Sequence, residues 1–319
     1  MKKIAIVTPG GDAPGMNACV RAVVRGAISM NFQVIGVLNG YQGLIDDTIT
    51  EMNLRSVSGI IHHGGTILKS SRCLQIKSSD GIKKAASNLK RHKINYLVVI
   101  GGDGSINAGI KISKYGIHTI GIPASIDNDI CGTDETIGFD TAIDTAVEAI
   151  DKIRDTAASF DRIFVIEVMG REHGFLALEI GLASGAEFVL IPEIRYNIDK
   201  IAKEIKKKQE NKKSSCIIIF AEGCGNSKEF ASQLSKKTSL EVRVSNLGYI
   251  QRGGNPSARS RNLAARFGAY AVSLIKKDAK NRIVVIKNNK ISSIPIITAV
   301  SGKKFIDSGI LRLINKLAV

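Results

Sequence analysis

Short runs of consecutive apolar, β-branched residues recur along the chain, separated by longer segments with an apolar residue at every third or fourth position. Fully apolar strands joined by helix-length segments are typical of a parallel sheet that helices cover on both faces. The pattern therefore predicts an α/β fold. The predicted strands are residues 3–8, 33–38, 96–100, 119–122, 162–168, 188–191, 216–221 and 282–287, and the clearest predicted helices are residues 16–30, 141–157, 198–209 and 257–277.

The first predicted strand leads into a glycine-rich loop, residues 8–17, with the sequence T-P-G-G-D-A-P-G-M-N. In open α/β sheets, ligands bind beyond the carboxyl ends of the strands. Glycines let backbone N–H groups approach phosphate oxygens at a helix N-terminus. The loop holds more glycine than a plain tight turn requires, and it fits neither the Walker A nor the dinucleotide pattern. It indicates a phosphate site of another type, with a plain turn as the alternative.

Two further loops place carboxylates directly after predicted strands. In G-G-D-G-S, residues 101–105, Asp103 stands between glycines, where it could hold Mg²⁺ on nucleotide phosphates. The alternative for Asp103 is a helix N-cap. In P-A-S-I-D-N-D, residues 123–129, Asp127 is the candidate general base, with the Ser125 hydroxyl before it. The alternative there is an Asx turn with solvated acids.

The charge balance is strongly basic, with a formal net charge of +16 and a pI near 9.7. This charge suits an anionic partner such as a phosphorylated metabolite, a nucleotide or a nucleic acid. Aromatic residues make up only 5% of the chain, and no basic stripe alternates with them as a base-stacking surface requires. Nucleic acid is therefore not expected as the main ligand. The 319 residues, 44% of them hydrophobic, suffice for two packed domains.

No feature of the sequence indicates export or a membrane. The N-terminal apolar run, residues 4–7, stops at a Pro-Gly-Gly turn and is too short for a signal sequence or a membrane span. The five cysteines are odd in number and widely spaced, without a C-x-x-C pair, which fits a reducing compartment. We expect a cytoplasmic protein with no membrane partner.

The motifs, taken in order along the chain, resemble those of the bacterial ATP-dependent 6-phosphofructokinase family. Besides the three loops above, they are G-G-T-I-L-K-S-S-R ending at Arg72, V-M-G-R ending at Arg171, A-E-G around Glu222 and G-Y-I-Q-R-G-G ending at Gly254. Each motif alone is weak. The ordered set, at nearly constant spacing, covers essentially the whole chain and is highly specific.

The resemblance implies transfer of a phosphoryl group from MgATP to the C1 hydroxyl of fructose 6-phosphate, the committing step of glycolysis. The expected catalytic residues are Asp127, Arg171, Ser125 and Arg72, and Asp103 is the expected Mg²⁺ residue, with Asp129 near it through water. The expected ATP contacts are Gly11, Tyr41, Arg72, Cys73, Gly102, Asp103, Gly104 and Ser105. The expected sugar-phosphate contacts are Ser125, Ile126, Asp127, Arg162, Met169, Gly170, Arg171, Glu222, Arg243, Tyr249 and Arg252.

The resemblance also implies two similar Rossmann-like three-layer lobes with mostly parallel sheets and an active site in the cleft between them. The ATP-binding lobe would take residues 1–138 and 252–305, and the fructose 6-phosphate-binding lobe residues 139–251 and 306–319. Arg162 and Arg243 would reach the substrate phosphate of a neighbouring subunit, so a homotetramer with shared sites is expected. Arginine suits these roles because its planar fork binds phosphate through two parallel hydrogen bonds.

The phosphoryl donor is expected to be ATP. Relatives that use pyrophosphate tend to carry an acid where this chain has Gly104 and a lysine where it has Ala124. Two alternatives stay open: a kinase of the same fold that uses pyrophosphate or another sugar phosphate, and a catalytically silent nucleotide-binding regulatory subunit. Loss of Asp103, Asp127 or Arg171 would indicate the silent subunit, and all three are present.

The chain departs from the family pattern at several positions. Ser125 replaces a threonine but keeps its hydroxyl, and Tyr249 replaces a histidine, which is expected to weaken fructose 6-phosphate binding. An effector site for ADP or phosphoenolpyruvate is matched by Arg21, Arg25, Arg154, Gly185, Glu187 and Lys213. Leu54, Gly59 and Asn211 replace charged residues of that site, so effector control is expected to be weak or absent.

Overall fold

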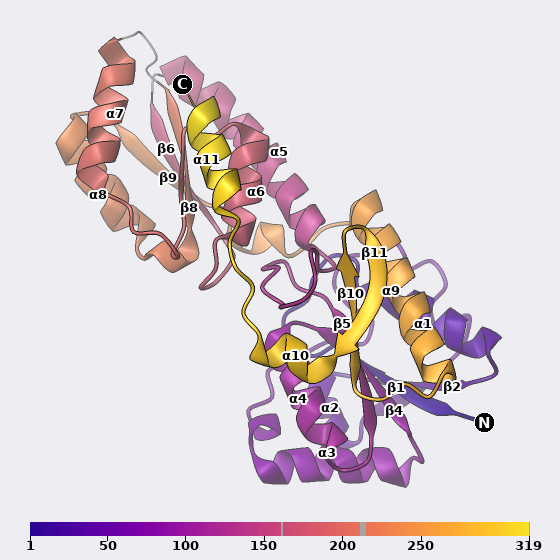
Figure 1. Cartoon of the computed structure of the whole chain (residues 1–319). Coiled ribbons are helices and arrows are strands. Elements are labelled where there is room, and N and C mark those ends of the chain that lie inside the picture. The colour runs from indigo at the N-terminus through magenta and orange to yellow at the C-terminus, as the bar shows by residue number, and fades with distance from the viewer. Residues whose placement is uncertain (161, 211–214, 319) are drawn as a thin grey trace. The chain divides into compact units, whose positions relative to one another are not determined.

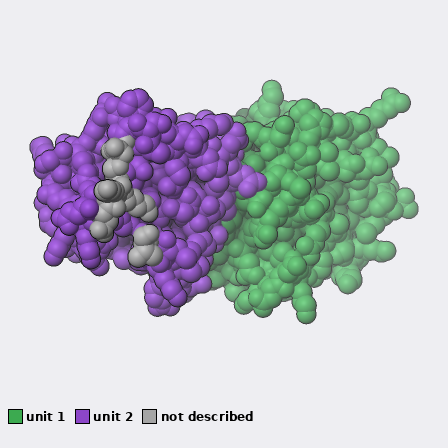
Figure 2. Space-filling model, turned by 90° about the horizontal axis from the view of Figure 1, so that it is seen from above, with its two compact units in different colours: residues 1–141, 252–304 green, residues 142–251, 305–319 purple. Residues whose placement is uncertain are grey.

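A computed structural model describes residues 1–160, 162–210 and 215–318 of the chain. The chain forms two compact units, shown in different colours in Figure 2. Unit 1 comprises Met1–Thr141 and Arg252–Lys304, and unit 2 comprises Ala142–Gln251 and Phe305–Val319. Each unit is therefore built from two separate segments of sequence.

Unit 1 is built on a seven-stranded sheet in the order β11-β10-β5-β4-β1-β2-β3 (Figure 1). The five central strands are parallel, while β3 and β11 pair antiparallel at the two edges. The elements of unit 1 are β1 (Lys3–Val7), α1 (Met16–Ser29), β2 (Gln33–Val37), α2 (Gly40–Asp46), β3 (Ile49–Met52), a 3₁₀ turn η1 (Gln75–Lys77), α3 (Ser79–Arg91), β4 (Tyr96–Gly101), α4 (Asp103–Ser113), β5 (His118–Pro123), α9 (Ala258–Lys276), β10 (Arg282–Lys287), β11 (Lys290–Pro295) and α10 (Ile296–Ser301).

Helices cover both faces of this sheet, as its apolar strands require. α1 packs along α9 on one face (Figure 1). On the other face, alternate residues of β1, β2 and β4 form a buried core with α2, α3 and α4. All six residues of β4 are buried. The central strands and their following loops are thereby held on a rigid base.

Unit 2 has a four-stranded parallel sheet in the order β7-β8-β6-β9. Its core packs this sheet against α7 and α8, and α11 packs on α6 and β7. The elements are α5 (Phe139–Phe160), which begins just before the unit boundary, β6 (Ile163–Val168), α6 (Phe175–Ser184), β7 (Phe188–Leu190), α7 (Ile198–Glu210), β8 (Cys216–Ala221), a 3₁₀ turn η2 (Glu222–Cys224), α8 (Ser227–Thr238), β9 (Val242–Asn246), a 3₁₀ turn η3 (Gly248–Gln251) and α11 (Ser308–Leu317).

The predicted α/β class with mostly parallel sheets is confirmed, and each predicted strand and helix is present. The sequence pattern did not reveal β3, β9 and β11. These three strands carry polar residues and are partly exposed, so they lack the continuous apolar run of a central strand. In the described part of the chain, no helix is both long and apolar enough to cross a membrane.

Candidate active site

The three motif loops of unit 1 follow three neighbouring parallel strands. β5, β4 and β1 lie side by side, with Val7 paired to Val99 and Gly101 to Pro123 near their carboxyl ends. The chain order reverses between β1 and β4, which makes their carboxyl ends a topological switch point. Such points bind ligands in open α/β sheets because the loops on either side diverge and leave a crevice.

The loop after β1 packs directly on the start of α4. The Ser105 hydroxyl donates to the carbonyl oxygen of Pro9 at 2.9 Å, and the Ser70 hydroxyl donates to the carbonyl oxygen of Gly10 at 2.7 Å. Gly10 has φ +86°, and a Cβ there would lie 2.9 Å from the Ser105 Oγ. Glycine is required at this position by both the backbone conformation and the close approach.

The neighbouring Gly11 lies against an arginine. A Cβ on Gly11 would lie 2.4 Å from a guanidinium nitrogen of Arg252, and that guanidinium forms an ion pair with Asp12 at 2.9 Å. Arg252 was predicted to contact the sugar phosphate, and the structure places it beside Gly11, a predicted ATP contact. Its substrate role stays a prediction. Asp12 was not singled out, although it lies within the glycine-rich motif.

Asn17 ties the first loop to the segment that leads to Arg72. Its buried side chain donates to the carbonyl oxygens of His63 and Gly64 at 3.1 and 3.0 Å and accepts from the N–H of Ile67 at 2.7 Å. The segment that carries Arg72 and Cys73 is thereby linked to the loop after β1. The predicted ATP contacts of these two segments consequently belong to one connected part of unit 1.

Asp103 is the first residue of α4, and Gly102 occupies the N-cap without a side-chain capping bond. Capping therefore does not account for Asp103. Loss of surrounding water and, next, the charge of Asp129 raise the pKa of the Asp103 carboxyl above its ordinary value. Tyr41 is buried, and its hydroxyl donates to the carbonyl oxygen of Ser105 at 2.6 Å, so it supports the start of α4.

The Ser125–Asp129 turn buries its candidate base. Asp127 is 5% exposed, and its N–H donates to the Ser125 hydroxyl oxygen at 3.2 Å. Between the two acids, Asn128 adopts a left-handed φ of +52°, which asparagine tolerates better than most residues. Its buried side chain donates to the carbonyl oxygen of Asp134 at 3.1 Å. Burial of Asp127 argues against a turn of solvated acids.

Asp103 and Asp129 fit a divalent cation. The Oδ1 atom of Asp129 is buried and has no hydrogen-bond partner within the described residues. The charge of Asp129 also raises the pKa of Asp103, so the two carboxylates repel one another. Among the described residues, no group of three or more His, Cys, Asp or Glu could hold a metal. This pair matches Mg²⁺, which usually takes one or two carboxylates and completes its shell with water and substrate phosphates.

In unit 2, the loops after β6 and β8 lie side by side because Val168 pairs with Ala221. The Oε1 atom of Glu222 accepts from the N–H groups of Gly170 and Arg171 at 3.1 and 2.5 Å. Arg171 has a left-handed φ of +53°, and its side chain is exposed. Glu222 therefore fixes the strained backbone that presents this guanidinium. Gln251, which was not singled out, accepts from the N–H of Met169 at 2.9 Å.

Arg162 lies directly before β6 of unit 2, and Arg243 lies on the neighbouring strand β9. Phe164 pairs with Arg243 in the β6–β9 register, and both arginines form ion pairs with Glu241. Two guanidinium groups share one carboxylate, which leaves a net positive charge at this place. Tyr249 lies in η3 and is 75% exposed. Contact of these side chains with a substrate phosphate stays a prediction.

The predicted effector residues fall in both units. Arg21 and Arg25 lie on α1 of unit 1. In unit 2, Arg154 donates to the carbonyl oxygens of Ser184 and Gly185 at 2.8 and 3.2 Å, and its guanidinium lies 3.7 Å from the Glu187 carboxylate. Leu54 is exposed. Lys213 and Asn211 lie outside the described residues.

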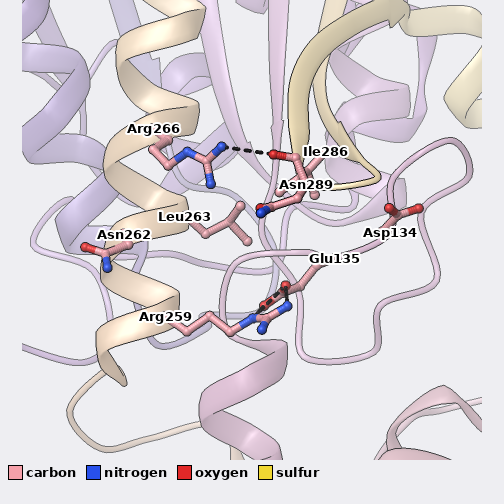
Figure 3. Close-up of a pocket in the computed structure, with 8 residues that line it drawn as sticks. All are labelled: Asp134, Glu135, Arg259, Asn262, Leu263, Arg266, Ile286 and Asn289. Atoms are coloured by element: carbon pink, nitrogen blue, oxygen red, sulfur yellow. Dashed lines mark hydrogen bonds and ion pairs between the residues drawn. The ribbon is translucent and has the colours of Figure 1, made fainter.

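A separate hollow of about 580 Å³ opens in unit 1 beside α9 and the turn between β10 and β11 (Figure 3). Its lining includes Leu263 and Ile286, which are both buried. Arg259 makes a forked ion pair with Glu135, with nitrogen–oxygen distances of 2.7 to 3.0 Å. The pair neutralises both charges and fixes the loop that carries Glu135 against α9 (Figure 3).

Glycine turns, buried acids and arginines at the ends of parallel strands define the class of open-sheet α/β proteins that bind phosphorylated ligands. The family model described as phosphofructokinase matches residues 3–275. The chain belongs to the phosphofructokinase family, and the predicted resemblance is confirmed.

Two named relatives match this chain in sequence over its full length. The chain is 50% identical over 319 residues to the ATP-dependent 6-phosphofructokinase of Bacillus subtilis strain 168, with both chains covered completely. It is 48% identical over 319 residues to the ATP-dependent 6-phosphofructokinase of Clostridioides difficile strain 630, again with complete coverage.

Solved structures show the same fold. Pichia pastoris phosphofructokinase in the T-state matches with a TM-score of 0.90 and 36% identity over 94% of this chain and 35% of that longer chain. The pyrophosphate-dependent phosphofructokinase of Marinobacter aquaeolei matches with a TM-score of 0.86 over 97% of this chain and 86% of that one. At 22% identity, the second likeness shows the fold alone.

Proposed function

We propose that this chain is an ATP-dependent 6-phosphofructokinase. It transfers a phosphoryl group to the C1 hydroxyl of fructose 6-phosphate and yields fructose 1,6-bisphosphate and ADP. The observation that carries the proposal is the full-length identity of about half to relatives named for this activity, together with an intact set of strand-end motifs. A silent regulatory subunit is disfavoured because Asp103, Asp127 and Arg171 are all retained.

The switch point of unit 1 suits the triphosphate of ATP. The glycines after β1 and β4 leave backbone groups open to phosphate oxygens, and the N-terminus of the 11-residue α4 adds a favourable dipole. Asp103 and Asp129 would hold Mg²⁺, which neutralises charge on the β- and γ-phosphates when bound. Arg72 and Cys73 would flank the nucleotide from the segment that Asn17 ties to the loop.

Asp127 is the general base of the proposed reaction. The C1 hydroxyl gives its proton to the Asp127 carboxylate while its oxygen bonds to the γ-phosphorus, and the bond from that phosphorus to ADP breaks. Burial of the carboxylate excludes water that would compete for the same hydrogen bonds.

Arg171 is the proposed stabiliser of the phosphoryl group in transfer. Glu222 fixes its backbone, so the point from which the guanidinium reaches the phosphoryl group is set in advance. Arg162 and Arg243, grouped around Glu241, would bind the 6-phosphate of a neighbouring subunit's substrate. As the family resemblance implies, we propose a homotetramer with shared sites.

A coupled assay tests the proposed function. The purified chain is supplied with fructose 6-phosphate and Mg²⁺ and with either ATP or pyrophosphate. We expect turnover with ATP and none with pyrophosphate. Turnover with pyrophosphate alone would assign the other donor, and the absence of turnover with both would contradict the proposal.

Donor choice is expected to depend on Gly104. A Cβ at this position would meet no atom within 4 Å, so the space beside the start of α4 is open. Gly104→Asp would place a negative charge in that space, and we expect the KM for ATP to rise at least about 10-fold, equivalent to about 1.4 kcal/mol. Steady-state kinetics with ATP measure the change. Gly104→Ala serves as the control, and an equal rise there would show that bulk, not charge, is responsible.

Effector control is expected to be weak. The charge of Arg154 is engaged by Glu187 and two carbonyl groups, and Leu54 offers no positive charge to a phosphate. Titration with ADP or phosphoenolpyruvate at low fructose 6-phosphate is therefore expected to change the rate by less than about 2-fold, or about 0.4 kcal/mol. A cooperative response of several-fold would contradict this expectation.

A further inference from the structure

The loop that follows the candidate base, residues 128–135, is packed between two other segments of unit 1. A Cβ on Gly132 would lie 2.5 Å from the Ile294 side chain of β11, and a Cβ on Gly302 would lie 2.4 Å from the Cys131 Sγ. The hairpin of β10 and β11 thus contacts the loop at one place, and the segment after α10 contacts it at another. Both contacts are too close for a larger residue.

Asp134 is the point where these segments are joined by hydrogen bonds. Its N–H donates to the carbonyl oxygen of Ile286 at 2.8 Å, and its carboxylate accepts from the N–H of Asn288 at 2.7 Å. Its carbonyl oxygen accepts two hydrogen bonds at 3.1 Å, one from the Asn128 side chain and one from the Lys304 ammonium. Figure 3 shows Asp134 on its loop beside this hairpin.

Lys304 is the last residue of unit 1 before the chain continues into unit 2. Burial lowers the pKa of its ammonium to about 8, and the charge of Asp134 followed by that of Asp129 opposes this shift. The hydrogen bond from this ammonium to the Asp134 carbonyl oxygen at 3.1 Å places the half-buried side chain against the acidic loop. Lys303, the preceding residue, is exposed and offers a matched comparison.

We propose that Lys304 is a positioning residue for phosphoryl transfer, which acts by holding the Asp127–Asp129 turn through the Asp134 carbonyl that it shares with Asn128. The expected effect of Lys304 on the reaction rate rests on the proposed function. Asn128 must keep a left-handed conformation for Asp127 and Asp129 to keep their positions, and its side-chain bond to Asp134 maintains that conformation. Lys304 fixes the carbonyl to which this bond is made. A displacement of about 1 Å at a reacting group can cost about 10²-fold in rate.

The kinetic test compares Lys304→Met with Lys304→Arg and Lys303→Met in the full chain. We expect Lys304→Met to lower kcat about 10- to 100-fold. Lys304→Arg is expected to recover most of the rate, and Lys303→Met to leave it unchanged. In an Asp127→Asn background, Lys304→Met should change the residual transfer of radiolabelled phosphate less than about 3-fold, since the base it positions is absent. Equal losses in both backgrounds would show that Lys304 does not act through the base Asp127 and would overturn the proposal.

A second measurement does not depend on activity. Amide hydrogen exchange of peptides that cover residues 125–135 is expected to quicken about 10-fold in Lys304→Met, as local opening becomes easier, and to stay unchanged in Lys303→Met. Unchanged exchange in Lys304→Met would overturn the positioning role. If the unaltered chain transfers no phosphoryl group, the proposed function fails by itself, and hydrogen exchange alone decides whether Lys304 holds the turn.

Discussion

Asp127→Asn is expected to lower kcat by about 10² to 10⁴-fold, the usual contribution of a general base. Asparagine has nearly the same shape as aspartate but cannot accept the proton of the C1 hydroxyl. Asp127 is buried in the loop after β5, so it has little contact with water that could replace it as the proton acceptor. Steady-state kinetics with fructose 6-phosphate and MgATP measure the change.

The matched control is Asp80→Asn, an exposed acid in the first turn of α3, which removes the same charge at a position outside the quoted motifs. It is expected to leave kcat unchanged. The KM for ATP should change little in Asp127→Asn, because Asp127 is assigned to the acceptor sugar. Full activity in Asp127→Asn would show that another group accepts the proton and would remove Asp127 from the mechanism.

Arg171→Gly is expected to lower kcat by about 10³-fold or more, in the range found for arginines that stabilise a phosphoryl group in transfer. Glycine suits this position because the backbone has a left-handed φ of +53°. The two hydrogen bonds from the backbone to Glu222 use N–H groups, which glycine also has. The substitution thus removes the guanidinium and keeps the backbone that presents it.

Arg171→Lys should retain part of the rate, because it keeps the positive charge and loses the fork that binds two oxygens. Arg195→Ala, at an exposed arginine of the same unit, is the control and is expected to be neutral. Melting temperatures of all three variants are measured alongside the kinetics. A loss of rate in Arg171→Gly that follows a loss of folded protein would assign Arg171 to stability instead of transfer.

The local pattern of apolar residues in the sequence predicted much of the fold. The buried strands of both sheets are continuous apolar runs, and these runs identified their positions because each strand is covered on both faces. The apolar pattern did not predict β3 and β11, because an edge strand has fewer buried neighbours and tolerates polar residues. The order of strands in each sheet is likewise absent from the pattern, since it depends on pairing between distant segments.

The motif loops were found from sequence because glycine and aspartate after a strand have a direct physical meaning. Their supporting residues were not. Asn128 lies inside a quoted motif, but its role depends on the carbonyl oxygen of Asp134, and Asp12 acquires its meaning only from Arg252, which is 240 positions away. No periodicity or composition marks such partners.

The amino-acid order alone was therefore enough to identify the α/β class, the family and the loops that carry the chemistry. The class and the loops depend on residues close together in the chain, and the family depends on the order and spacing of the motifs along it. The tertiary structure alone showed that β5, β4 and β1 are neighbours and that Glu222 holds the backbone of Arg171. It also showed that Lys304 meets the loop of the candidate base. The last two contacts join residues 51 and 170 positions apart, and only the packing of the folded chain decides which such residues meet.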